Sequence, residues 1–177
     1  MVLKSPPHTC RIKVLLELFP NAKFVHIVRD PYVIFPSTLN LWKRLYRDQG
    51  LQSPKFKGLE EHVFSTFERM YKVFERDRHL FAPGQFCEVH YEDLISRPIE
   101  QMRRIYDDLE LGDFDAVRPA LETYMAGQKD YKTNRYQLSP ENRGEIRRRW
   151  EKYLVQYGYQ TPAPVKVMEK PVPQTSS

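Results

Sequence analysis

A chain of 177 residues, of which 41% are hydrophobic and 13% aromatic, has enough apolar surface to bury one core. This composition excludes a disordered or fibrous protein, and no apolar run approaches the length of a membrane span. The net charge of +5 favours an anionic partner, which on composition alone is a nucleotide, a nucleic acid or an anionic membrane surface.

The amino-terminal third predicts strands that alternate with helices. Val2 and Leu3 are interpreted as the remainder of a strand, and a helix from residue 8 or 9 to 19 follows from apolar residues at helical spacing. The run 24–29 predicts a short strand that is covered on both faces, since it is apolar with one interruption. Asp-Pro then begins a helix over 31–48, which Pro36 is expected to kink.

The middle of the chain repeats this alternation. A loop over 50–58 precedes a long amphipathic helix over 59–80, and a second short strand covers 86–91. Two further helices are expected over 98–109 and 114–125, the latter interrupted near Pro119. Strands that alternate with helices predict a parallel sheet with helical crossovers.

The last segments are a loop, a helix and a tail. Residues 127–138 show no apolar period and predict a loop, and Ser139 caps a final helix that ends at Gly158. Residues 161–177 are rich in proline and predict a disordered tail. We therefore expect one domain over 1–160, with an α/β fold in which a short parallel sheet is flanked by helices in three layers.

Several other residues receive a structural interpretation. Cys10 and Cys87 lack metal-ligand spacing and are expected to be two small buried thiols, with a disulfide left open. The arginines from 143 to 149 are expected on a solvated helix face, where Glu145 could pair with Arg149.

Arg29 and Ser37 are the first candidate ligand-binding residues. Arg29 follows a predicted strand, and ligands of open α/β sheets bind outside the carboxyl ends of strands, where helix amino termini add N–H donors for an anion. The guanidinium fork matches a phosphate, and Ser37, two helical turns on, lies within its reach. The alternative is that Arg29 pairs with Asp30 or caps the strand end.

The segments that surround these two residues resemble one enzyme family. They are K-S-P-P-H-T, L-F-P-N-A-K, the strand with its R-D-P helix start, H-Y-E-D-L-I-S-R-P, and the closing Y-K-T-N-R-Y-Q-L-S-P-E. Together they are similar to sulfotransferases that use 3′-phosphoadenosine 5′-phosphosulfate (PAPS), in the broad group with bacterial and Golgi members. The resemblance implies a partial P-loop-type fold, PAPS as sulfuryl donor without a metal, a hydroxyl or amine acceptor, and Arg29 and Ser37 on the donor's 3′-phosphate.

The resemblance also assigns roles to other residues. Lys4 matches a lysine that contacts the transferring sulfuryl group or its bridging oxygen, and cationic stabilisation of a leaving oxygen fits that chemistry. Independently of the resemblance, His8 is a candidate general base, because imidazole titrates near neutral pH and the residue lies in the same loop as Lys4, although a histidine at a helix start more often caps or packs the helix. The late loop has the place of one that covers the nucleotide, through four polar or aromatic residues: Lys132, Asn134, Arg135 and Tyr136.

One expected element is missing from the sequence. The loop that cradles the 5′-phosphosulfate in these enzymes has no counterpart, because the seven glycines are scattered singly. We therefore expect the carboxyl-terminal portion of a sulfotransferase, with a non-catalytic nucleotide-binding or interaction remnant as the alternative and a nucleic-acid binder ranked last. No signal-peptide pattern is present, so we expect a soluble chain, cytoplasmic by default, with the Golgi lumen open if an anchor precedes it.

Overall fold

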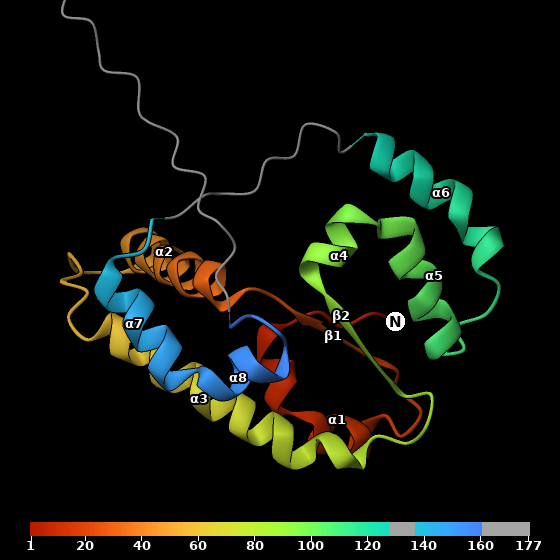
Figure 1. Cartoon of the computed structure of the whole chain (residues 1–177), viewed down its shortest axis with the longest axis horizontal. Helices are drawn as coiled ribbons and strands as arrows, with labels where there is room; N and C mark the ends of the chain where they lie inside the picture. Colours follow the sequence, from red (N-terminus) through yellow and green to blue (C-terminus); the bar gives the residue numbers. More distant parts are fainter. Residues whose placement is uncertain (128–136, 161–177) are drawn as a thin grey trace, which may run out of the picture.

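Two parallel strands run through the middle of the fold, with helices on either side (Figure 1). In the computed structural model, which describes residues 1–127 and 137–160, β1 (Phe24–Val28) pairs with β2 (Phe86–His90), from Phe24 opposite Phe86 to Val28 opposite His90. The other described elements are, in chain order, η1 (Pro6–Cys10), α1 (Ile12–Leu18), α2 (Pro31–Gln49), α3 (Leu59–Asp77), η2 (Arg78–Leu80), α4 (Tyr91–Ser96), α5 (Pro98–Asp108), α6 (Phe114–Ala126), α7 (Pro140–Arg149) and α8 (Glu151–Gln156). The expected α/β class, with a short parallel sheet between helices, is confirmed.

The main core lies on one face of the sheet and is rich in aromatic side chains. It joins Val28, the last residue of β1, to α2, α3, α7 and α8. Phe67 of α3 stacks on Trp150 with ring centroids 3.9 Å apart. Its buried members are Val28, Tyr32, Phe35, Leu39, Leu59, Val63, Phe64, Phe67, Ile146, Trp150, Tyr153, Leu154 and Tyr157. The carboxyl-terminal helices are thereby fixed against the first strand.

The opposite face of the sheet is covered only in part. Cys87 and Val89 of β2 are buried against α5, but Val25 and Ile27 of β1 are 43% and 50% exposed. The expectation of a strand covered on both faces is therefore wrong. In the register of the pair, Val25 lies beside Cys87, so α5 covers the β2 half of this face and leaves the β1 half open.

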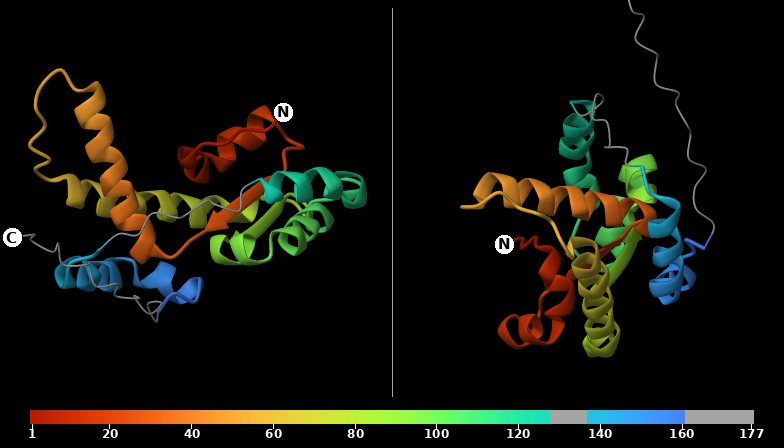
Figure 2. Two further views of the ribbon diagram at one scale, coloured as in Figure 1. Left: turned by 90° about the horizontal axis from the view of Figure 1, so that it is seen from above. Right: turned by 90° about the vertical axis from the view of Figure 1, so that its left-hand side faces the viewer.

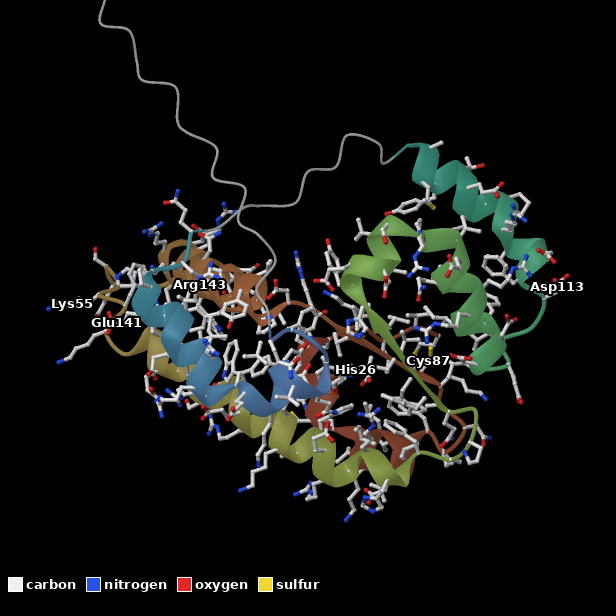
Figure 3. The ribbon with its side chains drawn as sticks, viewed as in Figure 1. His26, Lys55, Cys87, Asp113, Glu141 and Arg143 are labelled. Carbon is white, nitrogen blue, oxygen red and sulfur yellow. The ribbon has the colours of Figure 1, made fainter. Side chains whose placement is uncertain are left out.

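A polar cluster interrupts the apolar packing on the inner face. His26 is 9% exposed, and its Nδ1 lies 2.9 Å from Glu88 Oε2, while its Nε2 lies 3.2 Å from the hydroxyl of Tyr71. Tyr157 donates to Glu88 over 3.2 Å, and Arg78 contacts the same carboxylate at 3.4 Å. Figure 3 shows His26 in the middle of the molecule, between the sheet and the carboxyl-terminal helices. His26 and Tyr157 are buried, the other members are half-buried, and each polar group has a partner.

Several boundaries differ from the sequence-based predictions. Residues 1–5 form no strand, so the interpretation of Val2 and Leu3 is wrong, because no described strand lies beside them to complete a ladder. The first helix is split into η1 and α1, and α6 continues through Pro119. The last helix is divided at Trp150, which ends α7 and precedes α8. Most of the expected loop over 127–138 lies outside the described residues, and so does the whole of the expected tail over 161–177.

Two further observations concern the described part of the chain. None of its helices combines the length and the apolar character needed to cross a membrane. Both cysteines are free thiols, and only Cys87 is buried; burial raises the pKa of its thiol to about 11. The expectation of two buried thiols holds for Cys87, whereas Cys10 is half-buried.

We expect Glu88→Gln to lower the free energy of unfolding by about 1–3 kcal/mol at neutral pH, because it removes the negative charge and replaces one of the two acceptor oxygens, which receive bonds from three residues, by an NH2 donor. Burial by itself raises the pKa of Glu88, but the hydrogen bond from His26 and the charge of Arg78 hold it below its usual value. A carboxyl group with a lowered pKa stabilises the fold above its unfolded pKa. The difference between the two proteins should therefore be full above about pH 5 and shrink at lower pH.

Urea unfolding at a series of pH values measures this difference. Glu122→Gln, which removes an exposed i,i+4 pair with Arg118 on α6, is the matched control and should change stability by less than about 0.5 kcal/mol. Equal effects of the two variants would contradict the role of the polar cluster.

Candidate functional site

The two strands end at the same edge of the sheet and bring an arginine beside an aromatic ring. Val28 pairs with His90, so Arg29 and Tyr91 are the next residues along each strand. The Arg29 Cζ atom lies 4.0 Å from the centroid of the Tyr91 ring. This distance is typical of a cation–π contact, and it holds the guanidinium at the carboxyl edge, where parallel sheets bind ligands.

A tyrosine from the far end of the chain fixes the backbone of Arg29. The Arg29 N–H donates to the Tyr153 hydroxyl oxygen over 3.1 Å, and the Tyr153 O–H donates to the Arg29 carbonyl oxygen over 3.0 Å. Burial raises the pKa of Tyr153 to about 12, so this hydroxyl remains a donor at neutral pH. α8 therefore holds the end of β1 in place as a neighbouring strand would.

A second set of hydrogen bonds joins Asp30 to the end of β2. The Asp30 N–H donates to Glu92 over 3.1 Å, and the Tyr159 hydroxyl donates to the same carboxylate over 2.7 Å. His90 Nδ1 lies 3.0 Å from the Tyr159 oxygen. Because the Tyr159 proton is directed to Glu92, His90 Nδ1 carries the proton of this second bond and donates it to the Tyr159 oxygen. The backbone on both sides of the Arg29 side chain is thus anchored.

Asp30 also caps α2, as its sequence predicts. Its side chain accepts from the Tyr32 N–H over 2.8 Å. Burial raises the pKa of Asp30, the bond from Tyr32 opposes this, and the charge of Glu92 adds to the rise. The expected role of the α2 amino terminus as a donor of unpaired N–H groups needs correction, because the cap already occupies the Tyr32 N–H. An anion at this edge depends on side chains instead.

The Arg29 guanidinium makes no ion pair with a carboxylate of residues 1–127 or 137–160. The alternative that it pairs with Asp30 is therefore wrong. Both Arg29 and Ser37 are half-buried, and Ser37 lies in the second turn of α2, directly after the buried Pro36. Arg143 of α7 adds a positive charge nearby, since its Cζ lies 5.2 Å from the centroid of the Tyr32 ring.

No described contact joins Ser37 to Arg29, and none brings the remaining predicted site residues to this edge. Lys4 is exposed, in a segment without regular structure, and has no hydrogen bond or ion pair to Arg29 or Ser37. His8 lies in η1, which packs against α3, and its Nδ1 is buried without a partner among the described residues. The four residues of the late loop, Lys132, Asn134, Arg135 and Tyr136, lie outside the described residues.

Sequence reasoning missed the aromatic residues that hold Arg29. Tyr91 could have been found, because it follows the second strand at the place where Arg29 follows the first, and parallel strands end at one edge. Tyr153 and Tyr159 carried no such signal, since their partners at this edge are 124 and 67 residues away.

Comparisons with known proteins agree on one family. A family model described as "Sulfotransferase family" matches residues 1–116. The chain is 50% identical over 169 residues to a protein of Mycobacterium tuberculosis named Omega-hydroxy-beta-dihydromenaquinone-9 sulfotransferase Stf3, covering 94% of this chain and 44% of that protein. It is 28% identical over 108 residues to a putative protein-tyrosine sulfotransferase of Caenorhabditis elegans, covering 61% of this chain and 39% of that protein.

A solved structure shows the same fold. The sulfotransferase STF9 from Mycobacterium avium superposes with a TM-score of 0.69 over 87% of this chain and 41% of that chain, at 24% identity. The chain thus spans less than half the length of the curated relatives it matches.

We expect Tyr153→Phe to lower the free energy of unfolding by about 1–3 kcal/mol, because the Arg29 N–H and carbonyl lose their partner in a partly buried place. Denaturant unfolding measures this change. Tyr124→Phe, at a residue that is 65% exposed, is the control and should be nearly neutral. A neutral Tyr153→Phe would show that water replaces the hydroxyl without loss.

Proposed function

Because the chain belongs to the sulfotransferase family, we propose that it binds the donor PAPS and takes part in transfer of the sulfuryl group to a hydroxyl. In this proposal, Arg29 and Ser37 contact the 3′-phosphate of the donor. Residues 1–160 form the sulfotransferase-like domain, and the fold is part of the P-loop type.

The observation that carries the proposal is the position of the Arg29 side chain. It stands at the carboxyl edge of a parallel sheet, stacked on Tyr91 and without a described carboxylate partner. A guanidinium held in this way presents its fork to an incoming anion at small loss of side-chain freedom. The half-buried Ser37 supplies a hydroxyl, and Arg143 adds positive charge. These residues fit a phosphate monoester.

The transfer breaks the bond between the sulfuryl sulfur and the 5′-phosphate oxygen and forms a bond from that sulfur to the acceptor oxygen. The acceptor hydroxyl gives up its proton to a base, and adenosine 3′,5′-bisphosphate leaves. Lys4 is proposed to stabilise the negative charge that builds on the leaving oxygen, and His8 is the proposed base. Both roles require Lys4 and His8 to reach the sulfuryl group of a donor that is bound at Arg29. No described contact joins either residue to Arg29.

The acceptor is proposed to be a hydroxyl group rather than an amine. The mycobacterial relative is named for an omega-hydroxy menaquinone derivative, and the nematode relatives are named for tyrosine. Lys132, Asn134, Arg135 and Tyr136 are proposed to cover the donor nucleotide from the late loop. No metal takes part in the proposed reaction, and the compartment of the chain is left open.

A binding role without turnover is the second candidate. It is supported by the geometry, because Arg29 stands at the carboxyl edge of the sheet, whereas no described contact brings Lys4 or His8 to that edge. Such a chain would recognise the 3′-phosphate end of the nucleotide without completing the transfer.

We expect Arg29→Ala to weaken binding of adenosine 3′,5′-bisphosphate about 10- to 100-fold, because a hydrogen bond to a charged group contributes about 1.5–3 kcal/mol. Isothermal titration with the whole chain measures the affinity, and circular dichroism checks that the fold is retained. Arg11→Ala, at an exposed arginine of the same chain, should bind as the wild type does. Unchanged affinity in Arg29→Ala refutes the phosphate contact.

We expect Ser37→Ala to weaken the same binding by about fivefold, the effect of one neutral hydrogen bond. Ser65→Ala, at another half-buried helical serine, is the control, because the Ser65 hydroxyl contacts only the His62 carbonyl of its own helix in the described structure. Equal affinities of the two variants would remove Ser37 from the site.

Transfer of labelled sulfate from PAPS to a hydroxyl acceptor by the chain alone separates the two candidate functions. Product formation that is lost in Arg29→Ala supports the enzyme. Bisphosphate binding without any product supports the second candidate.

A further inference from the structure

The far end of α2 and the segment that joins it to α3 form a projection, residues 41–58, which we name the α2–α3 tip. Both views of Figure 2 show it standing out beyond the rest of the fold. Three large apolar or aromatic side chains of the tip are exposed to solvent: Leu41 is 54%, Tyr46 43% and Leu51 102% exposed. A single exposed leucine is ordinary, but several on one projection indicate a contact surface.

The tip also carries an excess of positive charge. Between residues 41 and 58 there are five basic residues and one acidic residue, Asp48, in a chain of net charge +5. The basic residues are Lys43, Arg44, Arg47, Lys55 and Lys57, and none of them forms an ion pair within the described residues. By contrast, Arg149 of α7 binds Glu61 and Glu68 of α3. The cations of the tip are therefore not ion-paired by the described part of the fold, although Glu60 and Glu61 line a hollow beside Lys43.

Aromatic rings lie among these cations. Arg47 Cζ is 5.4 Å from the centroid of the Phe56 ring, and the Trp42 and Tyr46 rings stack with centroids 5.7 Å apart. An open hollow of about 490 Å³ is lined by residues 54–59 together with Tyr46 and His62. Figure 3 shows Lys55 at this outer end of the molecule, far from His26.

We propose that the α2–α3 tip docks on the surface of a lipid bilayer that contains anionic phospholipids. The lysines and arginines lie at the level of the headgroup phosphates, and Leu41, Leu51 and Tyr46 enter the interface. Basic residues mixed with leucine and aromatic residues are the composition of membrane-surface segments. A nucleic acid would match the cations but not the exposed leucines, which have no partner on a phosphate backbone.

This docking is independent of nucleotide recognition. α2 has 19 residues and is about 28 Å long, and Arg29 precedes its first turn while the tip includes its last turns. Variants of the tip should therefore leave the affinity for adenosine 3′,5′-bisphosphate unchanged.

Co-sedimentation of the whole chain with vesicles tests the proposal. We expect binding to vesicles of equal parts phosphatidylcholine and phosphatidylglycerol, weakened by salt, and little binding to phosphatidylcholine alone. Lys55→Glu/Lys57→Glu should lower the partition coefficient at least about tenfold, since each basic residue near an anionic surface contributes about fivefold. Lys72→Glu/Lys152→Glu, with the same charge change at exposed residues of α3 and α8, should lower it by less than about threefold.

Leu51→Ser separates a membrane from other polyanions and cannot unfold the core, because Leu51 is fully exposed. It should weaken vesicle binding by several-fold and leave binding to a duplex oligonucleotide unchanged. The proposal is overturned if the wild type does not bind anionic vesicles, if the two charge-reversal pairs have equal effects, or if Leu51→Ser binds vesicles as well as the wild type does.

Discussion

One hydroxyl group fixes the place where β1 ends. Tyr153 both accepts from the Arg29 N–H and donates to its carbonyl, across 124 residues of sequence. Its ring packs in the core, with centroids 5.1 Å from Phe67 and 4.7 Å from Tyr71. Because the hydroxyl is attached to a buried ring, the position of Arg29 depends on the packing of α3 and α8. The geometry of the candidate site therefore depends on the aromatic core. A substitution that shifts the Tyr153 ring would displace the backbone of Arg29 even though no residue of the site itself is replaced.

Local signals predicted the elements of the fold well. Asp30 and Ser139 cap α2 and α7 as expected, and both strands lie within a residue of the predicted bounds. The errors concern what covers an element. An apolar run such as 24–29 shows that a strand prefers burial, but it cannot show that α5 covers only the β2 half of the sheet. Likewise, the break at Trp150 follows from its packing against three phenylalanines of α2 and α3, which no helical period reveals.

The residues of the candidate site also differ in how far the sequence predicts them. Arg29 was predictable, because a strand end and a helix start lie next to each other in the sequence. The partners that hold it were not, since Tyr153 and Tyr159 come from the last described turns. Arg149 shows the same limit: a local pair with Glu145 was expected, but Arg149 binds Glu61 and Glu68 of α3, and Arg148 takes Glu145 instead. Spacing along one helix identifies possible pairs, whereas tertiary contacts decide which of them form.

The open side of β1 lies next to the candidate site. Phe24 donates its N–H to Gln85, so in a parallel ladder the backbone groups of Val25 and Ile27 point away from β2, where no strand of the described residues pairs with them. Exposed apolar side chains beside an unpaired edge are what natural edge strands avoid. A parallel strand added there would end at the same edge as Arg29. An element that covers this edge would therefore border the candidate site.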